Sequence, residues 1–234
     1  LGSIAIPREY GGPQVSFVTL AEVFAIISAA DPALGQIPQN QFGILNLVLG
    51  SATEAQKKQL FKSVLDGWRI GNAGPERGTK NTLELKARIT TDGDSFVLNG
   101  QKFYSTGALF AHWVAVKALN DEGKQVLAFV RRGTPGLRIV DDWSGFGQRT
   151  TASGTILLNN VRVESGLVVD NWKINEAPNT QGAVSQLIQA AIDAGIARGA
   201  IDDAIEFVKT RARPWIDAKV ERASDDLYVI ADIG

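Results

Sequence analysis

The period of the hydrophobic pattern changes twice along this chain of 234 residues, and no other feature constrains the fold as much. Up to residue 67 the apolar residues recur at helical spacing, after Trp68 they alternate with polar residues, and from residue 184 the helical spacing returns. Helices require a period near 3.6 and half-buried strands a period of two. We therefore expect a helical region, a β region and a second helical region.

Caps and turn residues mark the ends of the expected helices. The first covers residues 16–30 and the second residues 33–49, with Gly50 as its C-cap. The third ends at Gly67, and its capping box is one of two candidates, Ser51 with Glu54 or Thr53 with Gln56. These helices are expected to form part of a helical bundle.

The later helix, residues 184–208, carries small residues four apart at Ala191, Gly195 and Gly199. Such a stripe lets another helix approach closely. Its partner is expected in the first bundle, in another subunit or in sequence outside this chain.

The middle region reads as strands separated by turns. Alternation is clearest at Leu83, Leu85, Ala87 and Ile89, and further strands are expected at residues 113–119 and 126–130. Turns are expected at residues 91–94, 99–100, 120–123 and 134–136. This pattern predicts an antiparallel barrel or sandwich, and no parallel βαβ unit of the nicotinamide-binding kind. The chain is thus α+β, with domains at residues 1–67, 68–177 and 178–234.

Composition excludes several classes of function. The formal net charge is −1, so no basic excess favours nucleic acid. There is no cysteine and one histidine, which leaves no ligand set for a metal. No apolar run is long enough to span a membrane and the start lacks a signal pattern, so we expect a cytoplasmic protein. The chain lacks methionine even at position 1, and it reads as a piece of something longer.

Two segments of the β region suggest a site for a flat ligand. Residues 71–79 form a loop rich in small residues, and residues 99–108 form the end of a hairpin. In an extended strand Tyr104 and Thr106 would share one face, which places an aromatic plane beside a hydroxyl. A flavin has apolar faces and an edge that needs hydrogen-bond donors, so this pairing suits it. The alternative is an ordinary hairpin with core aromatics and a turn at residues 99–100.

Several segments, in order, resemble the acyl-CoA dehydrogenase family. They are residues 6–12 (Ile-Pro-Arg-Glu-Tyr-Gly-Gly), 71–79, 99–108, and 153–155 followed by 160–163. Within that family, residues 71–73, 142–149 and 212–215 are most similar to the flavin monooxygenases of sulfur acquisition, of the dibenzothiophene and dimethyl-sulfone type. The resemblance implies a helical, β, helical flavoprotein, here truncated at both ends, and usually a homotetramer.

The resemblance also implies roles for individual residues. It places the Thr106 hydroxyl and amide at the reactive nitrogen of FMN or FAD, and Asn72 beside the ring. Ala73, Tyr104 and Ser105 are cofactor-binding neighbours in the same segments, and Arg213 matches a position that reaches the cofactor phosphate, commonly across a subunit boundary. From the residues alone, Thr106 can equally satisfy a neighbour, Asn72 can cap a turn, and Arg213 or Arg211 can end a helix.

No catalytic residue is assigned from the sequence. The family's catalytic glutamate is expected beyond Gly234, and Gln41 stands where the monooxygenases often have a proton-relaying histidine. Gln41, Trp143 and Phe146 are expected to bind substrate, although the two aromatics can instead plug a barrel end. His112 is expected to be a packing or surface residue.

We therefore expect a flavin-dependent oxidoreductase. The favoured function is a monooxygenase that takes reduced FMN, supplied by a flavin reductase, and acts on a small organosulfur compound. The alternatives are an FAD-dependent acyl-CoA dehydrogenase and a non-catalytic relative. In the segment that contacts coenzyme A in dehydrogenases, Lys80 reverses the charge of the usual aspartate, which disfavours an acyl-CoA substrate.

Overall fold

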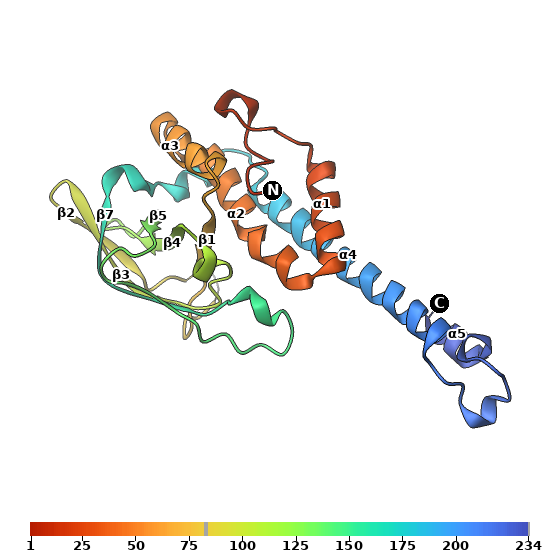
Figure 1. Ribbon diagram of the computed structural model, residues 1–234. Coiled ribbons are helices and arrows are strands. Elements are labelled where there is room, and N and C mark those ends of the chain that lie inside the picture. The colour runs from red at the N-terminus through yellow and green to blue at the C-terminus, as the bar shows by residue number, and fades with distance from the viewer. Residues whose placement is uncertain (82–83, 234) are drawn as a thin grey trace.

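The computed structural model describes residues 1–81 and 84–233 and places a helical region beside a sheet (Figure 1). The predicted succession of helical, β and helical regions is confirmed. The helices are α1 Phe17–Ala30, α2 Pro32–Ser51, α3 Glu54–Leu65, α4 Gln181–Thr210 and α5 Leu227–Ile233. Short 3-10 helices lie at Arg8–Tyr10, Ala108–Phe110, Arg149–Thr151, Ser165–Leu167, Asn171–Glu176, Ile216–Ala218 and Ala223–Asp225. No described helix is both long and apolar enough to cross a membrane.

Side-chain caps explain where the first and third helices begin. The Ser16 hydroxyl accepts a backbone hydrogen bond from the first turn of α1. Thr53 and Gln56 form a reciprocal capping box at α3, at 3.3 and 3.0 Å. Of the two predicted capping boxes, the structure thus forms the one that begins at Thr53.

The prediction that Gly50 caps α2 is wrong. The helix continues through Gly50 to Ser51, and Ala52 is the C-cap, with extended backbone. Two extended residues separate the helices, Ala52 as the C-cap of α2 and Thr53 as the N-cap of α3.

The strands form a sheet that is antiparallel except where β1 and β2 each pair with β4. Along the sheet the order is β6-β7-β3-β2-β4-β5-β8, and β1 lies off this path beside β4. Bounds are β1 Ile70–Ala73, β2 Arg88–Asp92, β3 Ser95–Lys102, β4 Trp113–Leu119, β5 Gln125–Arg131, β6 Leu137–Val140, β7 Thr155–Glu164 and β8 Val168–Val169. The pairing of β1 with β4 brings two distant segments of the chain side by side.

The expected turn at residues 99–100 is wrong. Asn99 and Gly100 lie inside β3, at a bulge in its pairing with β7. Asn160 of β7 donates its backbone N–H to the Asn99 side chain at 2.8 Å. β3 pairs with β7 on both sides of the bulge, so the Asn-Gly pair bends the strand without reversing it. The predicted turn at residues 91–94 is confirmed: it joins β2 to β3, and its Gly93 has a φ of 60°.

The alternating pattern before β2 is confirmed where the structure describes it. Leu85, Ala87 and Ile89 are buried, whereas the intervening charged residues are exposed. Hydrogen-bonded pairing as a strand begins at Arg88. Leu83, the first residue of the predicted pattern, lies outside the described residues.

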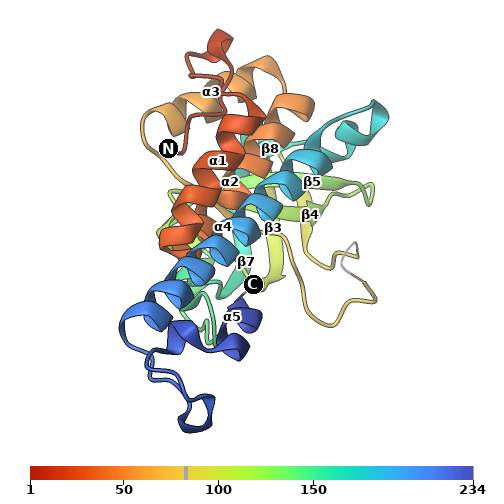
Figure 2. The ribbon, with the colours of Figure 1, turned by 90° about the vertical axis from the view of Figure 1, so that its right-hand side faces the viewer.

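The small-residue stripe of α4 has its partner in the first bundle. Helices α1 and α4 lie side by side (Figures 1 and 2). A Cβ atom built on Gly195 would lie 2.2 Å from the Ala25 carbonyl oxygen, and one built on Gly199 would lie 2.4 Å from the Ala29 carbonyl oxygen. Only glycine allows so close an approach of the two backbones.

Helix α2 is the central layer of the molecule. Its residues Ile44, Leu45, Leu47 and Val48 belong to the large core formed with α3 and the sheet. Phe42, on the same helix, belongs to a smaller core with α1 and α4, whose buried members are Leu20, Phe24, Phe42, Val184, Ile188 and Ile192. The sheet, α2 and the α1–α4 pair therefore stack as three layers.

Candidate functional site

The segment that follows β3 is a turn, and it corrects one expectation. Strand β3 ends at Lys102, and Tyr104 has a φ of 53°, in the left-handed region. The Thr106 N–H donates to the Tyr104 carbonyl at 2.9 Å. The prediction that Tyr104 and Thr106 share a strand face is wrong because the chain is not extended here.

Thr106 begins a row of three hydroxyl groups. Its Oγ1 lies 2.7 Å from the Ser153 Oγ, which lies 2.8 Å from the Thr151 Oγ1. Thr151 also reaches the Gln148 carbonyl at 3.0 Å. Thr151 and Ser153 are buried, whereas Thr106 is half-buried. This row is hereafter called the hydroxyl row, and Thr106 is its accessible end.

Sequence reasoning missed the other two members of the hydroxyl row. Ser153 belongs to a segment that resembles the family, and nothing in the sequence singles out its hydroxyl or that of Thr151. They are brought to Thr106 by β7, which pairs with β3, and by a bond from the Ser105 N–H to the Gly154 carbonyl at 3.0 Å. No local spacing could show this contact, because more than 40 residues separate the partners.

Asn72 lies beside the Thr106 turn. Its backbone N–H, in β1, donates to the Thr106 carbonyl at 3.1 Å. A Cβ atom on the neighbouring Gly71 would lie 2.4 Å from the Cα of Ala108, so the two segments touch through their backbones. The structure thus brings together Asn72 and Thr106, as the sequence predicted for a common site.

Ala73 and Ser105, which adjoin Asn72 and Thr106 in the sequence, have buried side chains. Ala73 is fully buried and belongs to the large core. Ser105 is 1% exposed, and its hydroxyl has no hydrogen-bond partner among the described residues. Any contact of Ala73 or Ser105 with a ligand would therefore use the backbone.

Aromatic residues and one cation lie at the exposed side of the turn. Tyr104 and Trp143 meet edge to face with 6.4 Å between ring centroids. The Arg77 guanidinium lies over the rings of Phe103 and Tyr104, at 4.4 and 4.9 Å. Trp143 Nε1 donates to the Gln148 carbonyl at 3.1 Å, the same carbonyl that Thr151 reaches. Phe146 makes no part of this wall, because its side chain is completely exposed.

Gln41 is buried in α2 and joins three segments. Its Oε1 accepts the Ile70 backbone N–H at 2.9 Å, and its Nε2 donates to the Gly2 carbonyl at 2.8 Å. Both polar atoms of the amide are therefore occupied by backbone groups.

Two adjoining hollows of about 150 and 300 Å³ lie between α2 and the sheet. They share three lining residues, Asn40, Asn72 and Lys117, and Gln41 lines neither. This pair of hollows is called the Lys117 cavity below. Because Asn72 lines it and also contacts the Thr106 segment, the cavity adjoins the site predicted from the sequence.

A buried ion pair stands beside the Lys117 cavity. Lys102 Nζ lies 2.6 Å from Glu76 Oε1, and the two side chains are 0% and 4% exposed. Burial by itself would raise the pKa of Glu76, but hydrogen bonds from Lys102 and from two backbone N–H groups lower it below its ordinary value. The pair fixes the loop of residues 74–76 against β3.

Arg213 and His112 lie away from this site. Arg213 is exposed in the segment after α4, which Figure 1 shows extending away from the sheet. His112 accepts the Arg69 backbone N–H at 3.0 Å and stacks on Trp68, with 5.5 Å between centroids. Burial, Arg69 and Arg132 lower the pKa of His112. His112 is half-buried and packs on Trp68, which agrees with the expectation of a packing or surface residue.

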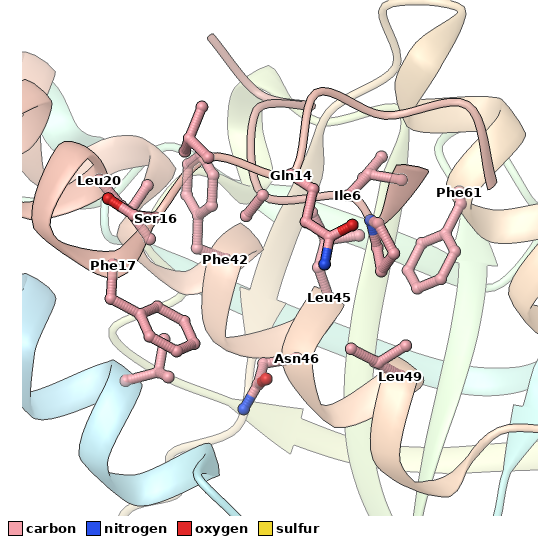
Figure 3. Close-up of a pocket in the computed structure, with 14 residues that line it drawn as sticks. Ile6, Gln14, Ser16, Phe17, Leu20, Phe42, Leu45, Asn46, Leu49 and Phe61 are labelled. Atoms are coloured by element: carbon pink, nitrogen blue, oxygen red, sulfur yellow. The ribbon is translucent and has the colours of Figure 1, made fainter. Parts of the chain in front are cut away.

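A separate pocket of about 290 Å³ lies between the N-terminal segment and helices α1 and α2 (Figure 3). Phe17, Leu20, Phe42, Leu45 and Leu49 give it a largely apolar lining. None of the residues that line it is Asn72 or Thr106. Across residues 1–81 and 84–233 no three His, Asp or Glu side chains are grouped to hold a metal ion.

Both family models and individual proteins resemble this chain. The acyl-CoA dehydrogenase N-terminal domain matches residues 1–68, and the acyl-CoA dehydrogenase middle domain matches residues 73–161. A dibenzothiophene monooxygenase of Rhodococcus erythropolis is 32% identical, over 99% of this chain and 59% of that protein. SfnC of Pseudomonas putida, a probable FMNH2-dependent monooxygenase, is 24% identical, over 99% of this chain and 58% of that protein.

One solved structure extends the comparison to three dimensions. TdsC from Paenibacillus sp. A11-2, in complex with FMN and indole, matches with a TM-score of 0.89 and 28% identity. The match covers 100% of this chain and 61% of TdsC. The chain therefore spans about three fifths of the length of these relatives.

Proposed function

The chain belongs to the acyl-CoA dehydrogenase family, and from that premise we propose that the whole protein is a monooxygenase that uses reduced FMN to oxidise a small organosulfur compound. The observation that carries the proposal is the contact of Thr106, the accessible end of the hydroxyl row, with Asn72, which lines the Lys117 cavity. The names of the similar monooxygenases support the choice of reaction.

The residues present fit a flavin. Thr106 offers a hydroxyl at the accessible end of the hydroxyl row, and Tyr104, which is 48% exposed, offers an aromatic face. We propose that Thr106, Asn72 and Tyr104 hold the ring and that Arg213 binds the phosphate of a flavin in another subunit. When bound, reduced FMN supplies the two electrons needed to activate oxygen for transfer to sulfur.

Proton supply must come from a group other than Gln41. An amide does not titrate near neutral pH, and both of its polar atoms are engaged with backbone groups. We propose that Gln41 positions the N-terminal segment and β1 around the site. Trp143 is proposed to close one side over the substrate, and Phe146, being fully exposed, to contact substrate only if its loop moves.

An FAD-dependent acyl-CoA dehydrogenase is the second candidate, favoured by the family itself. Against it stands Lys80, where the dehydrogenase segment has an acidic residue. The homotetramer, the flavin reductase that supplies FMNH2 and the cytoplasmic location belong to the proposal as predictions from the sequence.

The test uses the full-length protein titrated with FMN and with FAD, followed by absorbance and flavin fluorescence. We expect stoichiometric binding of FMN, and oxygen uptake with a sulfoxide or sulfone product when FMNH2 and an aromatic sulfide are supplied. Reduction of a dye by acyl-CoA, with no sulfur oxidation, would establish the dehydrogenase instead. Failure to bind either FMN or FAD would overturn both candidate functions, the monooxygenase and the dehydrogenase.

A further inference from the structure

Three arginine residues and one histidine meet at one end of strands β1, β4 and β5. Arg69 directly precedes β1, His112 directly precedes β4, Arg131 is the last residue of β5, and Arg132 follows it. Backbone hydrogen bonds of 2.9 Å join the His112 N–H to the Arg69 carbonyl and the Arg132 N–H to the His112 carbonyl. Because β4 pairs with both β1 and β5, residues that are far apart in the sequence lie side by side here.

These side chains line a hollow of about 340 Å³, which is called the arginine hollow below. Besides the three arginines and His112, its lining residues are Trp68, Phe110 and Ala111. It shares no lining residue with the Lys117 cavity, and neither Asn72 nor Thr106 lines it. The arginine hollow is therefore distinct from the site proposed for the flavin ring.

The arginine hollow carries three positive charges without a counter-charge. Arginine stays protonated in proteins, so its charge does not depend on the surroundings as that of lysine does. No acidic residue is among the described residues that line the hollow, and none of its arginines forms an ion pair across residues 1–81 and 84–233. Burial lowers the pKa of His112, and the charges of Arg69 and Arg132 lower it further, as a positive field does. A hollow with such a field attracts anions.

The backbone of one 3-10 helix, Ala108–Phe110, orients two of the guanidinium groups. Arg69 Nε donates to the Phe110 carbonyl at 2.9 Å, and Arg132 Nη1 donates to the Leu109 carbonyl. Each guanidinium has five N–H donors, and these bonds use one donor of each. The remaining donors have no partner in the described part of the chain, so both groups are held in place and still open to a ligand.

Arg131 and His112 complete the set of donors. The Arg131 guanidinium lies over the Trp68 ring, 5.1 Å from its centroid, and makes no hydrogen bond to the residues that the structure describes. The Nδ1 atom of His112 accepts the Arg69 backbone N–H at 3.0 Å, so the neutral ring carries its proton on Nε2, which is a donor. Every polar side-chain atom left free in the arginine hollow is therefore a hydrogen-bond donor.

We propose that the arginine hollow binds a tetrahedral dianion, either free sulfate or the phosphate group of a small molecule. Three positive charges favour two negative charges on the ligand over the single charge of a carboxylate. The N–H donors of a guanidinium form a fixed fork that matches the oxygen atoms of such ions. Sulfate and the dianion of a phosphate monoester offer acceptors alone, which suits a hollow whose free polar atoms are donors.

The test measures the affinity of three anions for the full-length protein by calorimetry at about pH 7.5, where phosphate monoesters are mostly dianions. Sulfate represents the free ion, phenyl phosphate represents a phosphate group on a small molecule, and acetate represents a singly charged anion. We expect the preferred dianion to bind at least about tenfold more tightly than acetate, as for hydrogen bonds between charged groups. The dianion that binds more tightly identifies the class of ligand. Equal affinity for all three anions would overturn the inference.

Two variants and one control locate the site. Arg69→Gln combined with Arg132→Gln removes two charges and keeps amide donors, and we expect it to weaken binding of the preferred dianion at least about tenfold. Arg131→Gln removes one charge from a side chain that makes no hydrogen bond to the described residues, and we expect a loss of at least about threefold. Arg138→Gln is the control, because Arg138 is exposed on β6 and does not line the arginine hollow. Wild-type affinity in either folded variant would refute the proposal.

His112 provides an independent measure of where the dianion binds. Its pKa is followed by NMR, with the resonances assigned by comparison with His112→Asn. We expect the preferred dianion to raise this pKa, because a negative charge in the hollow offsets the field of Arg69 and Arg132. An unchanged pKa at saturation would place the ion elsewhere on the protein and contradict the proposal.

A titration in the presence of FMN distinguishes this inference from the proposed function. With one equivalent of FMN bound, we expect the affinity for the dianion to stay the same, because the arginine hollow is separate from the site proposed for the flavin ring. Loss of dianion binding on addition of FMN would refute a separate site and leave the proposed function intact. Dianion binding by a protein that binds no flavin would support the arginine hollow and refute the proposed function.

Discussion

Tyr104 shows how one residue changes the geometry of a site. Its left-handed backbone turns the chain directly after β3, so that the Thr106 hydroxyl meets Ser153 instead of pointing from a strand face. Non-glycine residues adopt this conformation rarely, and nothing in the local sequence indicates it. The sequence assigns Asn72 and Thr106 to one ligand, and the structure joins their backbones by a hydrogen bond that no local pattern indicates.

Replacement of Thr106 by valine should weaken flavin binding. The shape is kept and the hydroxyl is lost, so we expect the dissociation constant for FMN to rise about 2- to 12-fold, as for one hydrogen bond of about 0.5–1.5 kcal/mol. Fluorescence quenching during FMN titration measures it. Thr90→Val, at an exposed site on β2, is the control, and an affinity equal to that of the wild type would refute the role of Thr106.

Glu76→Gln should destabilise the protein in a pH-dependent way. It leaves Lys102 buried without a counter-charge, at a cost of about 3–5 kcal/mol near neutral pH. Because the pKa of Glu76 is lowered from 4.5, the carboxylate stabilises the fold above that pH, and this contribution is lost as the pH falls through the lower folded value.

Urea unfolding at about pH 7 and about pH 3 tests this expectation. The difference in the free energy of unfolding between the wild type and Glu76→Gln should be large at the higher pH and smaller at the lower pH. The double variant Glu76→Gln, Lys102→Met should recover much of the lost stability, because it leaves no unpaired charge. If the difference in unfolding free energy were the same at both pH values, the stabilising role of the Glu76 carboxylate would be refuted.

At the scale of elements, the sequence predicts the features that depend on residues close together along the chain. The limits of β4 and the small-residue stripe on α4 follow from local spacing, and local spacing also narrows the capping box of α3 to two candidates, of which the structure forms Thr53–Gln56. The Asn-Gly pair was misread because the same dipeptide serves a hairpin turn or a bulge, and the pairing with β7 makes the choice. Lys117 gave no signal, since a lysine in an apolar strand normally faces water.

The contact of α1 with α4 makes Gly195 sensitive to a single methyl group. Gly195→Ala should lower stability by about 1–3 kcal/mol, because the new Cβ meets the Ala25 carbonyl at 2.2 Å, despite the better helix propensity of alanine. Thermal unfolding followed by circular dichroism measures the change. On the same helix Gly182 has nothing within 4 Å, so Gly182→Ala should be neutral or stabilising by up to about 1 kcal/mol. Equal changes in stability for Gly195→Ala and Gly182→Ala would contradict this explanation.

At the scale of the whole molecule, α2 couples the helical layers to the sheet. One helix contributes to both hydrophobic cores, so loss of either core removes packing from a helix that the other core also uses. The sequence separated residues 1–67, 68–177 and 178–234 by the period of their patterns, and those boundaries remain predictions. The period identifies elements but does not show which of them share a core.

Cooperative unfolding is the expected consequence. Phe42→Ala, which opens the smaller core, should cost about 3–5 kcal/mol and lower the midpoints of far-ultraviolet circular dichroism and tryptophan fluorescence together. Leu34→Ala, at a position of α2 that is 58% exposed, should change neither midpoint by more than a small amount. A fluorescence transition that stays at its wild-type midpoint would show that the layers unfold separately.

The hydroxyl row has two possible polarities. If Thr151 donates to the Gln148 carbonyl, Ser153 donates to Thr151 and Thr106 to Ser153, so that Thr106 shows an outward lone pair. If the order reverses, Thr106 shows an outward proton, and the Gln148 carbonyl still accepts from Trp143. Rotation of the three O–H bonds, without movement of any heavy atom, therefore allows the Thr106 hydroxyl either to accept a hydrogen bond from a ligand or to donate one to it.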